Sequence, residues 1–496
     1  MTLENQFSPR VNDEESISYL CDLSAKLHTS AQNYIQPVGD QSVLFAPDAP
    51  GLPVVVTQWM SDLLASFSGG SSVAELMMSG RFGDQSFDGI VNAVGFLEEN
   101  GFLSREGNST GFKPSREAYL DTPSSMSVWL HIINNCNLGC SYCFVEEMSQ
   151  RRDLMTRPEL EKAVRRIEKT AIDRNVQEIT VKFAGGEPTL AAESMEYAYD
   201  YLAPRLADAG KRLQFAVLSN GTAITPRIID FLHRPGVGIG ISIDGIEHYH
   251  DAHRVFKNGR GGSWSKIAGN VDLLKREGVP PYIMATTTAE SAPGLPMLVE
   301  WIFSNDLSTR LNVVRGHEDR DVDLATKQAS YRELVTACIE GFEGVFDYVR
   351  RNHQRVDMAR QLHVCELSFD YPLQGPACGI GRSHVVYDHK GFLTDCVMTM
   401  HAARTPATDD LLADVQQTVE HMPFDADSCA GQAGCHQCQW FSVCGGGCPT
   451  GNERTNGHPY TRSPICDFYK YVIPRYVEVL AENMLVREQH ACMVCH

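Results

Sequence analysis

Strand and helix patterns alternate between residues 126 and 320, and this alternation limits the fold more than any other feature. Six short apolar runs typical of buried strands are separated by segments whose apolar residues recur at helical spacing. The expected strands are Val128–Ile133, Ile179–Phe183, Gln214–Ser219, Gly238–Ile243, Tyr282–Thr287 and Leu311–Val314, with helices such as Arg157–Thr170 and Trp264–Arg276 between them. Six successive βα units predict an α/β fold with a partial (β/α)6 TIM-like barrel.

The flanking segments have different characters. Residues 35–120 contain strand candidates at Val43–Phe45 and Val54–Val56, three helical patterns and an expected hairpin from Gly101–Leu103 to Gly111–Phe112, which together indicate a winged-helix-like module. Residues 1–34 are an acidic lead-in that we expect to be disordered, 321–364 form a helical bridge, and 471–496 form a final helix with a cysteine-containing tail. Residues 365–470 are rich in cysteine and glycine with little periodicity, so we expect metal clusters to hold this segment together.

Three cysteines follow the first expected strand at once. Cys136, Cys140 and Cys143 have the spacing C-x3-C-x2-C, and three thiolates on one loop can hold three irons of a [4Fe–4S] cluster. The fourth iron then stays open to a small chelating molecule. A zinc site would usually recruit a fourth Cys or His, and buried cysteines that merely pack are the other alternative. The location at the carboxyl end of a barrel strand, where active sites form, favours the cluster.

Composition narrows the function. The chain has 16 cysteines, and its polar, acidic start lacks the apolar stretch of a secretory signal. We therefore expect a cytoplasmic protein that uses cysteine for metal binding, not for disulfides. The net charge of −19 disfavours nucleic acid as a partner, and no apolar run is long enough to predict a membrane span.

With this loop and the motifs that follow, residues 126–470 resemble the radical S-adenosylmethionine (SAM) family. In that family the open iron binds the amino and carboxylate groups of SAM, and one electron cleaves SAM to a 5′-deoxyadenosyl radical. The resemblance implies roles for motifs at the ends of successive strands. Tyr142 would lie near the adenine, Gly185, Gly186, Glu187 and Pro188 would hold the amino group, Ser242 and Asp244 would contact the ribose and other polar groups, and Arg254 would pair with the carboxylate. Asn220, after the third strand, is a further cofactor-binding candidate.

Seven further cysteines carry a second resemblance, to the SPASM domain, which holds two auxiliary [4Fe–4S] clusters. The resemblance implies three clusters in all. It assigns Cys435, Cys438, Cys444 and Cys466 to an outer cluster and Cys378, Cys396 and Cys448 to an inner one. Some relatives supply the fourth inner ligand six positions before the first cysteine, where this chain has Pro372. Cys365 or Cys429 could replace it, or the corner could be open to substrate; zinc knuckles are the alternative for the whole segment.

The remaining cysteines carry less information. Cys338 lies on a helical pattern and is expected in the core, and Cys21 is expected to be inert. Cys492 and Cys495 in the tail could ligate a cluster, bind zinc or act as a dithiol, or the tail could have no function.

SPASM relatives act on peptides and proteins, and the N-terminal module is similar to RiPP recognition elements, which bind a leader peptide as an added strand. The expected partners are therefore a precursor peptide with a leader and a flavodoxin- or ferredoxin-type reductant. The expected reaction is oxidative cross-linking, as a thioether or a carbon–carbon bond. Alternative reactions are peptide epimerisation and formylglycine formation in sulfatases. A protein without catalytic activity, such as an electron carrier or redox sensor, is the non-enzyme alternative, and the N-terminal module could be a purely structural winged helix. Maturases that form formylglycine carry aspartate directly after the second SPASM cysteine, whereas this chain has Val397 there and Asp395 before it. We predict no catalytic base; the loop candidates are Asp395, His317, Glu318 and Asp319.

Overall fold

The computed structural model describes residues 23–30, 32–105, 123–145, 153–259, 261–315, 324–373, 375–400, 405–418, 434–459 and 461–494. The chain divides into two compact units, Met1–Phe112 and Lys113–His496. Each unit is described by itself below.

The first unit combines a small antiparallel sheet with three helices. Strands β2, β3 and β4 pair in that order, and the short strands β1 and β5 pair with each other. The bounds are β1 His28–Thr29, β2 Tyr34–Val38, β3 Gln41–Phe45, β4 Val54–Thr57, α1 Gln58–Ala65, α2 Val73–Met78, α3 Phe87–Glu99 and β5 Leu103–Ser104. The predicted strands at Val43–Phe45 and Val54–Val56 are confirmed, whereas β5 pairs with β1; the other half of the expected hairpin, residues 111–112, lies outside the described residues.

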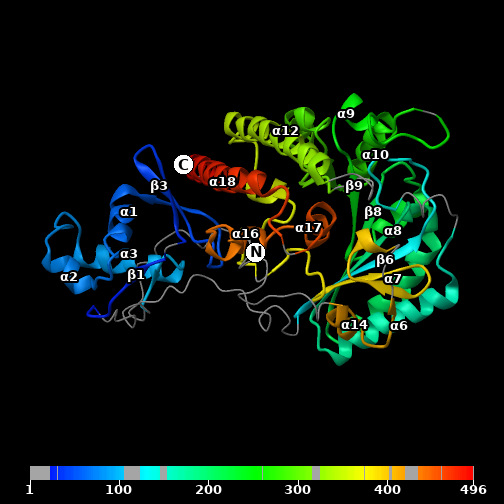
Figure 1. Cartoon of the computed structure of the whole chain (residues 1–496), viewed down its shortest axis with the longest axis horizontal. Helices are drawn as coiled ribbons and strands as arrows, with labels where there is room; N and C mark the ends of the chain where they lie inside the picture. Colours follow the sequence, from blue (N-terminus) through cyan, green and yellow to red (C-terminus); the bar gives the residue numbers. More distant parts are fainter. Residues whose placement is uncertain are drawn as a thin grey trace. The chain divides into compact units, whose positions relative to one another are not determined.

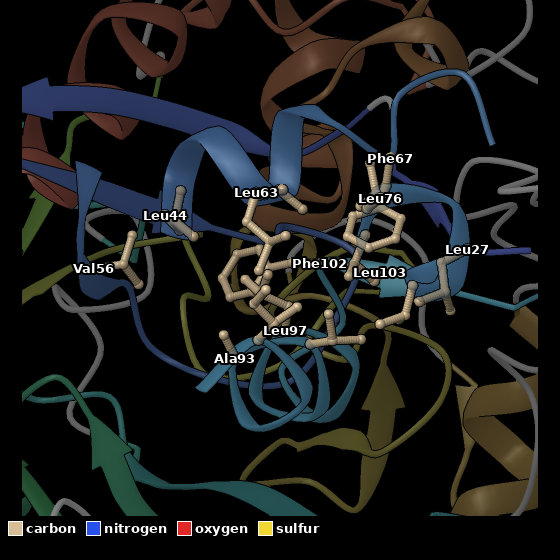
Figure 2. Packing of buried hydrophobic residues seen from close by; sticks show 14 of the residues in the cluster. Leu27, Leu44, Val56, Leu63, Phe67, Leu76, Ala93, Leu97, Phe102 and Leu103 are labelled. Atoms are coloured by element: carbon tan, nitrogen blue, oxygen red, sulfur yellow. The ribbon is translucent and has the colours of Figure 1, made fainter. Parts of the chain in front are cut away.

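One hydrophobic core holds this unit together. Leu44 from β3, Leu63 from α1 and Leu97 from α3 are each 0% exposed, and Figure 2 shows their side chains pointing toward a common centre with Phe102. Leu27, just before β1, belongs to the same core, so the folded module includes residues from the segment that the sequence placed in a disordered lead-in.

The second unit is built on a ten-stranded sheet in the order β12-β11-β10-β9-β8-β7-β6-β13-β14-β15. Strands β6 to β11 pair in parallel with their neighbours in chain order, which is the outcome expected for successive βα units. The bounds are β6 Ser125–Ile133, β7 Glu178–Gly185, β8 Arg212–Ser219, β9 Val237–Ser242, β10 Tyr282–Thr287, β11 Thr309–Val313, β12 Leu362–Val364, β13 His384–Tyr387, β14 Phe392–Thr394 and β15 Thr405–Pro406. The six predicted barrel strands are confirmed, and the sequence missed the four later ones.

Helices follow most of these strands (Figure 1). Their bounds are α6 Arg157–Asp173, α7 Ala192–Asp208, α8 Pro226–Leu232, α9 His248–Asp251, α10 Trp264–Arg276, α11 Leu295–Ser304, α12 Leu324–Arg351, α13 Met358–Gln361, α14 Leu411–Thr418, α16 Phe441–Cys444, α17 Pro449–Asn456 and α18 Cys466–Val494. The long helices α12 and α18 lie side by side, with the rings of Phe342 and Phe468 packed edge to face at 5.0 Å. In the described part of the chain, no helix combines the length and the apolar character needed to cross a membrane.

Buried aromatic rings stabilise the sheet beneath the helices. Phe183 on β7 is 0% exposed and stacks on Phe215 of β8 with ring centres 5.4 Å apart. Parallel strands in chain order also bring the carboxyl ends of β6, β7, β8 and β9 to one edge of the sheet. The motifs found in the sequence lie at this edge.

Candidate active site

The three-cysteine loop leaves the end of β6 and lies against a segment far along the chain. Leu138 forms an antiparallel bridge with Phe256, and the Gly139 N–H donates to the carbonyl oxygen of Val255 at 2.9 Å. The Lys257 N–H donates back to the Asn137 carbonyl at 3.1 Å. The loop is therefore fixed at its centre by the segment that follows α9.

The three thiols lie close enough to influence one another. Burial raises the pKa of Cys136, and the charge of Cys143 adds to this effect. Burial also raises the pKa of Cys140 to about 12, with further contributions from Cys143 and Cys136. Three thiolates crowded in such a place need nearby positive charge, and bound metal supplies it because coordination deprotonates thiols. Among the described residues, no three His, Cys, Asp or Glu side chains are close enough to hold a single metal ion.

Gly185 and Gly186 allow close backbone contact between β7 and the start of the cysteine loop. The Gly186 N–H donates to the Ile133 carbonyl oxygen at 2.7 Å, and a Cβ on either glycine would overlap backbone atoms of residues 133–135. Gly185 also has a φ of +148°, which favours glycine. The resemblance assigns these glycines to the SAM amino group; in the structure they accommodate the chain that leads into Cys136.

Glu187 is fully buried and bonded to protein groups on both oxygens. Oε1 accepts from the Ser219 hydroxyl at 2.8 Å and from the Thr189 hydroxyl at 2.6 Å, and Oε2 accepts from the Asn220 N–H at 2.7 Å. Burial raises the pKa of Glu187, and these hydrogen bonds oppose the rise. The carboxylate thus ties the end of β7 to the end of β8, and the buried Pro188 continues the chain into the 3-10 helix Pro188–Ala191.

Asn220 connects the end of β8 to the cysteine loop. Its side-chain amide donates to the Asn137 side-chain oxygen at 2.9 Å and lies 3.7 Å from the Cys136 sulfur. Asn137 in turn donates to the Thr222 hydroxyl at 2.7 Å. These amides position the first cysteine and supply a donor to its sulfur.

A buried ion pair follows β9. The Arg254 guanidinium donates to the Asp244 carboxylate from Nε at 2.7 Å and from Nη2 at 3.3 Å, and Nη1 lies 3.8 Å from the Cys140 sulfur. The same carboxylate accepts from the Tyr142 hydroxyl and from the Thr286 N–H at 2.8 Å. Burial alone would raise the pKa of Asp244, but the Arg254 charge and these hydrogen bonds hold it below its usual value. Arg254, which the resemblance assigns to the SAM carboxylate, therefore forms an ion pair with Asp244 next to the cysteine loop.

Two histidines near this pair were missed at the sequence level. Nδ1 of the buried His250 accepts from the Asp244 N–H at 3.3 Å, which leaves Nε2 to donate to the Ser263 hydroxyl at 3.0 Å. Burial lowers the pKa of His250 to about 4, so this neutral tautomer is the stable form. His253 lies 2.7 Å from the Ser141 hydroxyl and so supports the cysteine loop from behind. Ser242, the last residue of β9, is half-buried and lies two residues before Asp244 in the sequence.

The outer set, defined as Cys435, Cys438, Cys444 and Cys466, gathers around α16 and the start of α18. Burial raises the pKa of Cys435 to about 11, with contributions from the charges of Cys466 and Cys438. Burial also raises the pKa of Cys444, and the other three thiols add to it.

The inner set, defined as Cys378, Cys396 and Cys448, forms a separate group. Cys378 is solvent-exposed, yet desolvation by the surrounding protein raises the pKa of its thiol to about 11, and the charges of Cys396 and Glu366 add to the effect. Burial raises the pKa of Cys448, where Cys396 again contributes. Cys365 lies nearby, with its sulfur accepting from Arg315 at 3.1 Å.

Several sequence candidates lie elsewhere. Cys338 is buried in α12, as expected for a core residue. Asp395 accepts from the Thr399 hydroxyl at 2.9 Å. Cys492 lies within α18. The following candidates fall outside the described residues: Cys21, His317, Glu318, Asp319, Cys429 and Cys495.

Together, these contacts define a three-thiol site at the carboxyl edge of a parallel α/β sheet. Residues 130–290 match the Radical SAM superfamily, so the chain contains a radical SAM domain. A cysteine-type anaerobic sulfatase-maturating enzyme from Clostridium novyi (strain NT) is 26% identical over 174 residues, which cover 35% of this chain and 46% of that enzyme. The chain thus matches about half the length of that relative.

Longer matches extend beyond this domain. A serine-type anaerobic sulfatase-maturating enzyme from Klebsiella aerogenes is 25% identical over 354 residues, covering 66% of this chain and 81% of the enzyme. A solved structure described as native anSMEcpe with bound AdoMet and Cp18Cys peptide has a TM-score of 0.55 at 19% identity, covering 73% of this chain and 99% of that one. The chain is thus homologous to anaerobic sulfatase maturases and shares the fold of one such structure.

Proposed function

We propose that the chain is a radical SAM enzyme that modifies a ribosomal peptide by oxidative cross-linking, as a thioether or a carbon–carbon bond. The observation that carries this proposal is the convergence of the cysteine loop with Glu187, Asn220 and the Asp244–Arg254 pair. These groups follow four successive parallel strands and contact one another directly or through the loop.

The donor set fits an iron–sulfur cluster with bound SAM. Cys136, Cys140 and Cys143 would hold three irons, and the guanidinium of Arg254 supplies positive charge next to Cys140. The cluster and SAM, when bound, supply a carbon-centred radical that removes a hydrogen atom from an unactivated carbon. The chain's task is to orient these groups and exclude water. Asp244 serves the first need, because it fixes both Arg254 and Tyr142.

The proposal includes two further [4Fe–4S] clusters, one held by the outer set and one by the inner set, and therefore three clusters in all. Each set brings together cysteines that are far apart in sequence, such as Cys435 with Cys466 and Cys396 with Cys448. Cross-linking removes two hydrogen atoms from the peptide. One leaves as a hydrogen atom; the other leaves as a proton and an electron, and an auxiliary cluster can accept that electron. A flavodoxin- or ferredoxin-type protein would supply or remove electrons, which is consistent with a cytoplasmic enzyme.

The first unit would hold the leader of the precursor peptide as an added strand. Among the described residues, β2 and β4 are the edges of its three-stranded sheet. β2 contains Pro37, which has no N–H to donate, whereas β4 contains no proline. β4 is therefore the better edge for strand addition.

Formylglycine formation is the second candidate, because several relatives are sulfatase-maturating enzymes. The position after Cys396 disfavours it. Val397 packs against an apolar cluster that includes Val386 and Met400, together with Cys143 and Phe144. A hydrophobic side chain cannot act as the base that an aspartate supplies there in such relatives, and Asp395 is bonded to Thr399.

The test uses the full chain reconstituted anaerobically with iron and sulfide, then incubated with SAM and dithionite. We expect 5′-deoxyadenosine, and we expect Cys140→Ala to abolish it. Cys338→Ala is the matched control, because Cys338 is a buried cysteine of α12 outside the three cysteine groups. An absence of 5′-deoxyadenosine from the wild type would refute the enzyme proposal.

Mass spectrometry of a co-expressed precursor peptide then separates the reactions. Cross-linking removes the mass of two hydrogen atoms and leaves no aldehyde. Formylglycine reacts with a hydrazide reagent, and epimerisation in deuterated water adds one deuterium without cross-linking. A hydrazide adduct would replace the cross-linking proposal with the maturase reading.

A further inference from the structure

An ion pair outside the SAM site connects two segments near the inner set. Arg315 follows β11, and Glu366 follows the short strand β12. Their side chains form a salt bridge, and the Glu366 side chain is only 9% exposed. Glu366 has a φ of +68°, a left-handed conformation that is unfavourable for a residue other than glycine. A strained backbone persists only where the surrounding structure holds it, and the salt bridge from Arg315 to the buried Glu366 side chain is one such contact.

Contacts on both sides place this pair among the cysteine-bearing segments. Arg315 donates to the Cys365 sulfur at 3.1 Å, and Glu366 is the next residue along the chain. Two residues later the Ser368 N–H donates to the carbonyl oxygen of Val443 in α16, the helix that precedes Cys448, at 2.9 Å. In keeping with these contacts, the charges of Glu366 and Arg315 act with opposite signs on the pKa of Cys378 and on that of Cys448.

Glu366 also reaches toward the outer set. Its Oε2 accepts from the hydroxyl of Tyr469, a buried residue on α18 three positions after Cys466. Burial raises the pKa of Tyr469, with added effects from Glu366 and Cys444. Tyr469 thus contacts the carboxylate on one side and lies within electrostatic reach of an outer cysteine on the other.

Resting on the proposed function, we propose that Arg315 and Glu366 are positioning residues that set the reduction potential of the inner auxiliary cluster in opposite directions. Cluster potentials depend on the charge and hydrogen bonding around the cysteine sulfurs. A negative charge stabilises the oxidised cluster, and a positive charge stabilises the cluster after it has gained one electron. Tyr469 moderates the pair, because its hydroxyl donates to the carboxylate.

The consequence concerns the electron released during cross-linking. As the new bond forms, the substrate would lose one proton to a base or solvent and one electron to the inner cluster held by Cys378, Cys396 and Cys448. That electron would leave through the outer cluster to the flavodoxin- or ferredoxin-type acceptor. The balance of the two charges would decide how readily the inner cluster accepts this electron.

The experiment is an anaerobic redox titration with dithionite, followed by electron paramagnetic resonance, on the full chain. It is carried out with Cys136, Cys140 and Cys143 all replaced by alanine, so that only the auxiliary clusters contribute. A further Cys396→Ala exchange identifies the inner signal. Glu366→Gln should raise the inner midpoint potential, because Arg315 is left uncompensated, and Arg315→Gln should lower it. Unchanged potentials in both variants, or shifts in the same direction, would overturn the inference.

Two further variants keep the test decisive. Tyr469→Phe leaves the ion pair in place and should lower the inner potential by a smaller step, because the carboxylate loses a donor. It carries the test if a charge variant fails to fold, and an unchanged potential then counts against the inference. Tyr476→Phe is the matched control: Tyr476 is buried on the same helix and donates to the Leu362 carbonyl at 2.6 Å. A parent protein without auxiliary signals and without the corresponding iron would instead refute the three-cluster proposal itself.

Discussion

Replacing Asp244 by asparagine tests whether the Asp244–Arg254 pair is a structural requirement of the site. The change keeps the side-chain shape but removes the negative charge that faces Arg254. Asp244 is 0% exposed and the Arg254 side chain is 10% exposed, so water can compensate little of the remaining positive charge. Breaking a buried ion pair from one side costs about 3–5 kcal/mol. We expect a loss of that size in the free energy of unfolding.

The control is Asp200→Asn, which removes the partner of Arg234 from an exposed pair. The Asp200 side chain is 63% exposed, so this change should cost less than about 1 kcal/mol. Both variants are compared with wild type by urea denaturation. Hydrogen exchange at the Thr286 amide, which donates to Asp244, reports the local effect and should speed up only in Asp244→Asn.

A double variant completes the test. Arg254→Met combined with Asp244→Asn removes both buried charges, so it should be more stable than Asp244→Asn alone. If Asp244→Asn costs no more than Asp200→Asn, or if the double variant is the least stable of the set, charge compensation is not what holds this site together.

Three other predictions follow from contacts described above. Gly186→Ala forces a Cβ into backbone atoms of residues 134–135 and should cost about 1–3 kcal/mol and reduce the iron bound at the cysteine loop, whereas Gly238→Ala, with nothing within 4 Å of its Cβ, should bind iron as wild type does. His250 takes up a proton near pH 6.5 in the unfolded chain but only near pH 4 in the folded chain, so the free energy of unfolding should fall by up to about 3 kcal/mol as the pH is lowered from 6.5 to 4. In denaturation curves, His250→Gln should flatten this pH dependence, and His233→Gln, a change at an exposed site, should not. Ser72→Ala removes the capping box of α2 and should lower the stability of the first unit by about 1 kcal/mol, measured by thermal unfolding; an unchanged melting temperature would show that the cap contributes nothing.

The strands of the parallel sheet could be predicted because each is a short apolar run bounded by polar residues. β10, for example, has the predicted bounds Tyr282–Thr287. The later strands were missed for a different reason. β13 contains a similar apolar run, His384–Tyr387, but it is four residues long and lies in a cysteine-rich segment without periodicity. Its place beside β6 depends on pairing between residues more than 250 positions apart, and no local pattern encodes such pairing.

The candidate site was predictable where chemistry and strand ends coincide. Residue type and position brought Glu187 and Asp244 to the right edge of the sheet. The sequence did not show that both carboxylates are fully occupied by protein donors, because their partners Ser219, Asn220, Thr286 and Arg254 lie on other strands and loops. In the segment His253–Phe256, which supports the cysteine loop, the sequence singled out only Arg254, and nothing local in it indicated the pairing with Leu138.

The pairing of Leu138 with Phe256 has a consequence for the folding of the protein during its synthesis on the ribosome. The loop at 136–143 acquires its partner only after residue 257 has been synthesised, 114 residues later. At translation speeds of about 5–20 residues per second, that delay is roughly 6–23 s. During this interval the centre of the loop lacks the segment that fixes it, so delivery of iron and sulfide is best timed after the fourth strand and its following segment have left the exit tunnel.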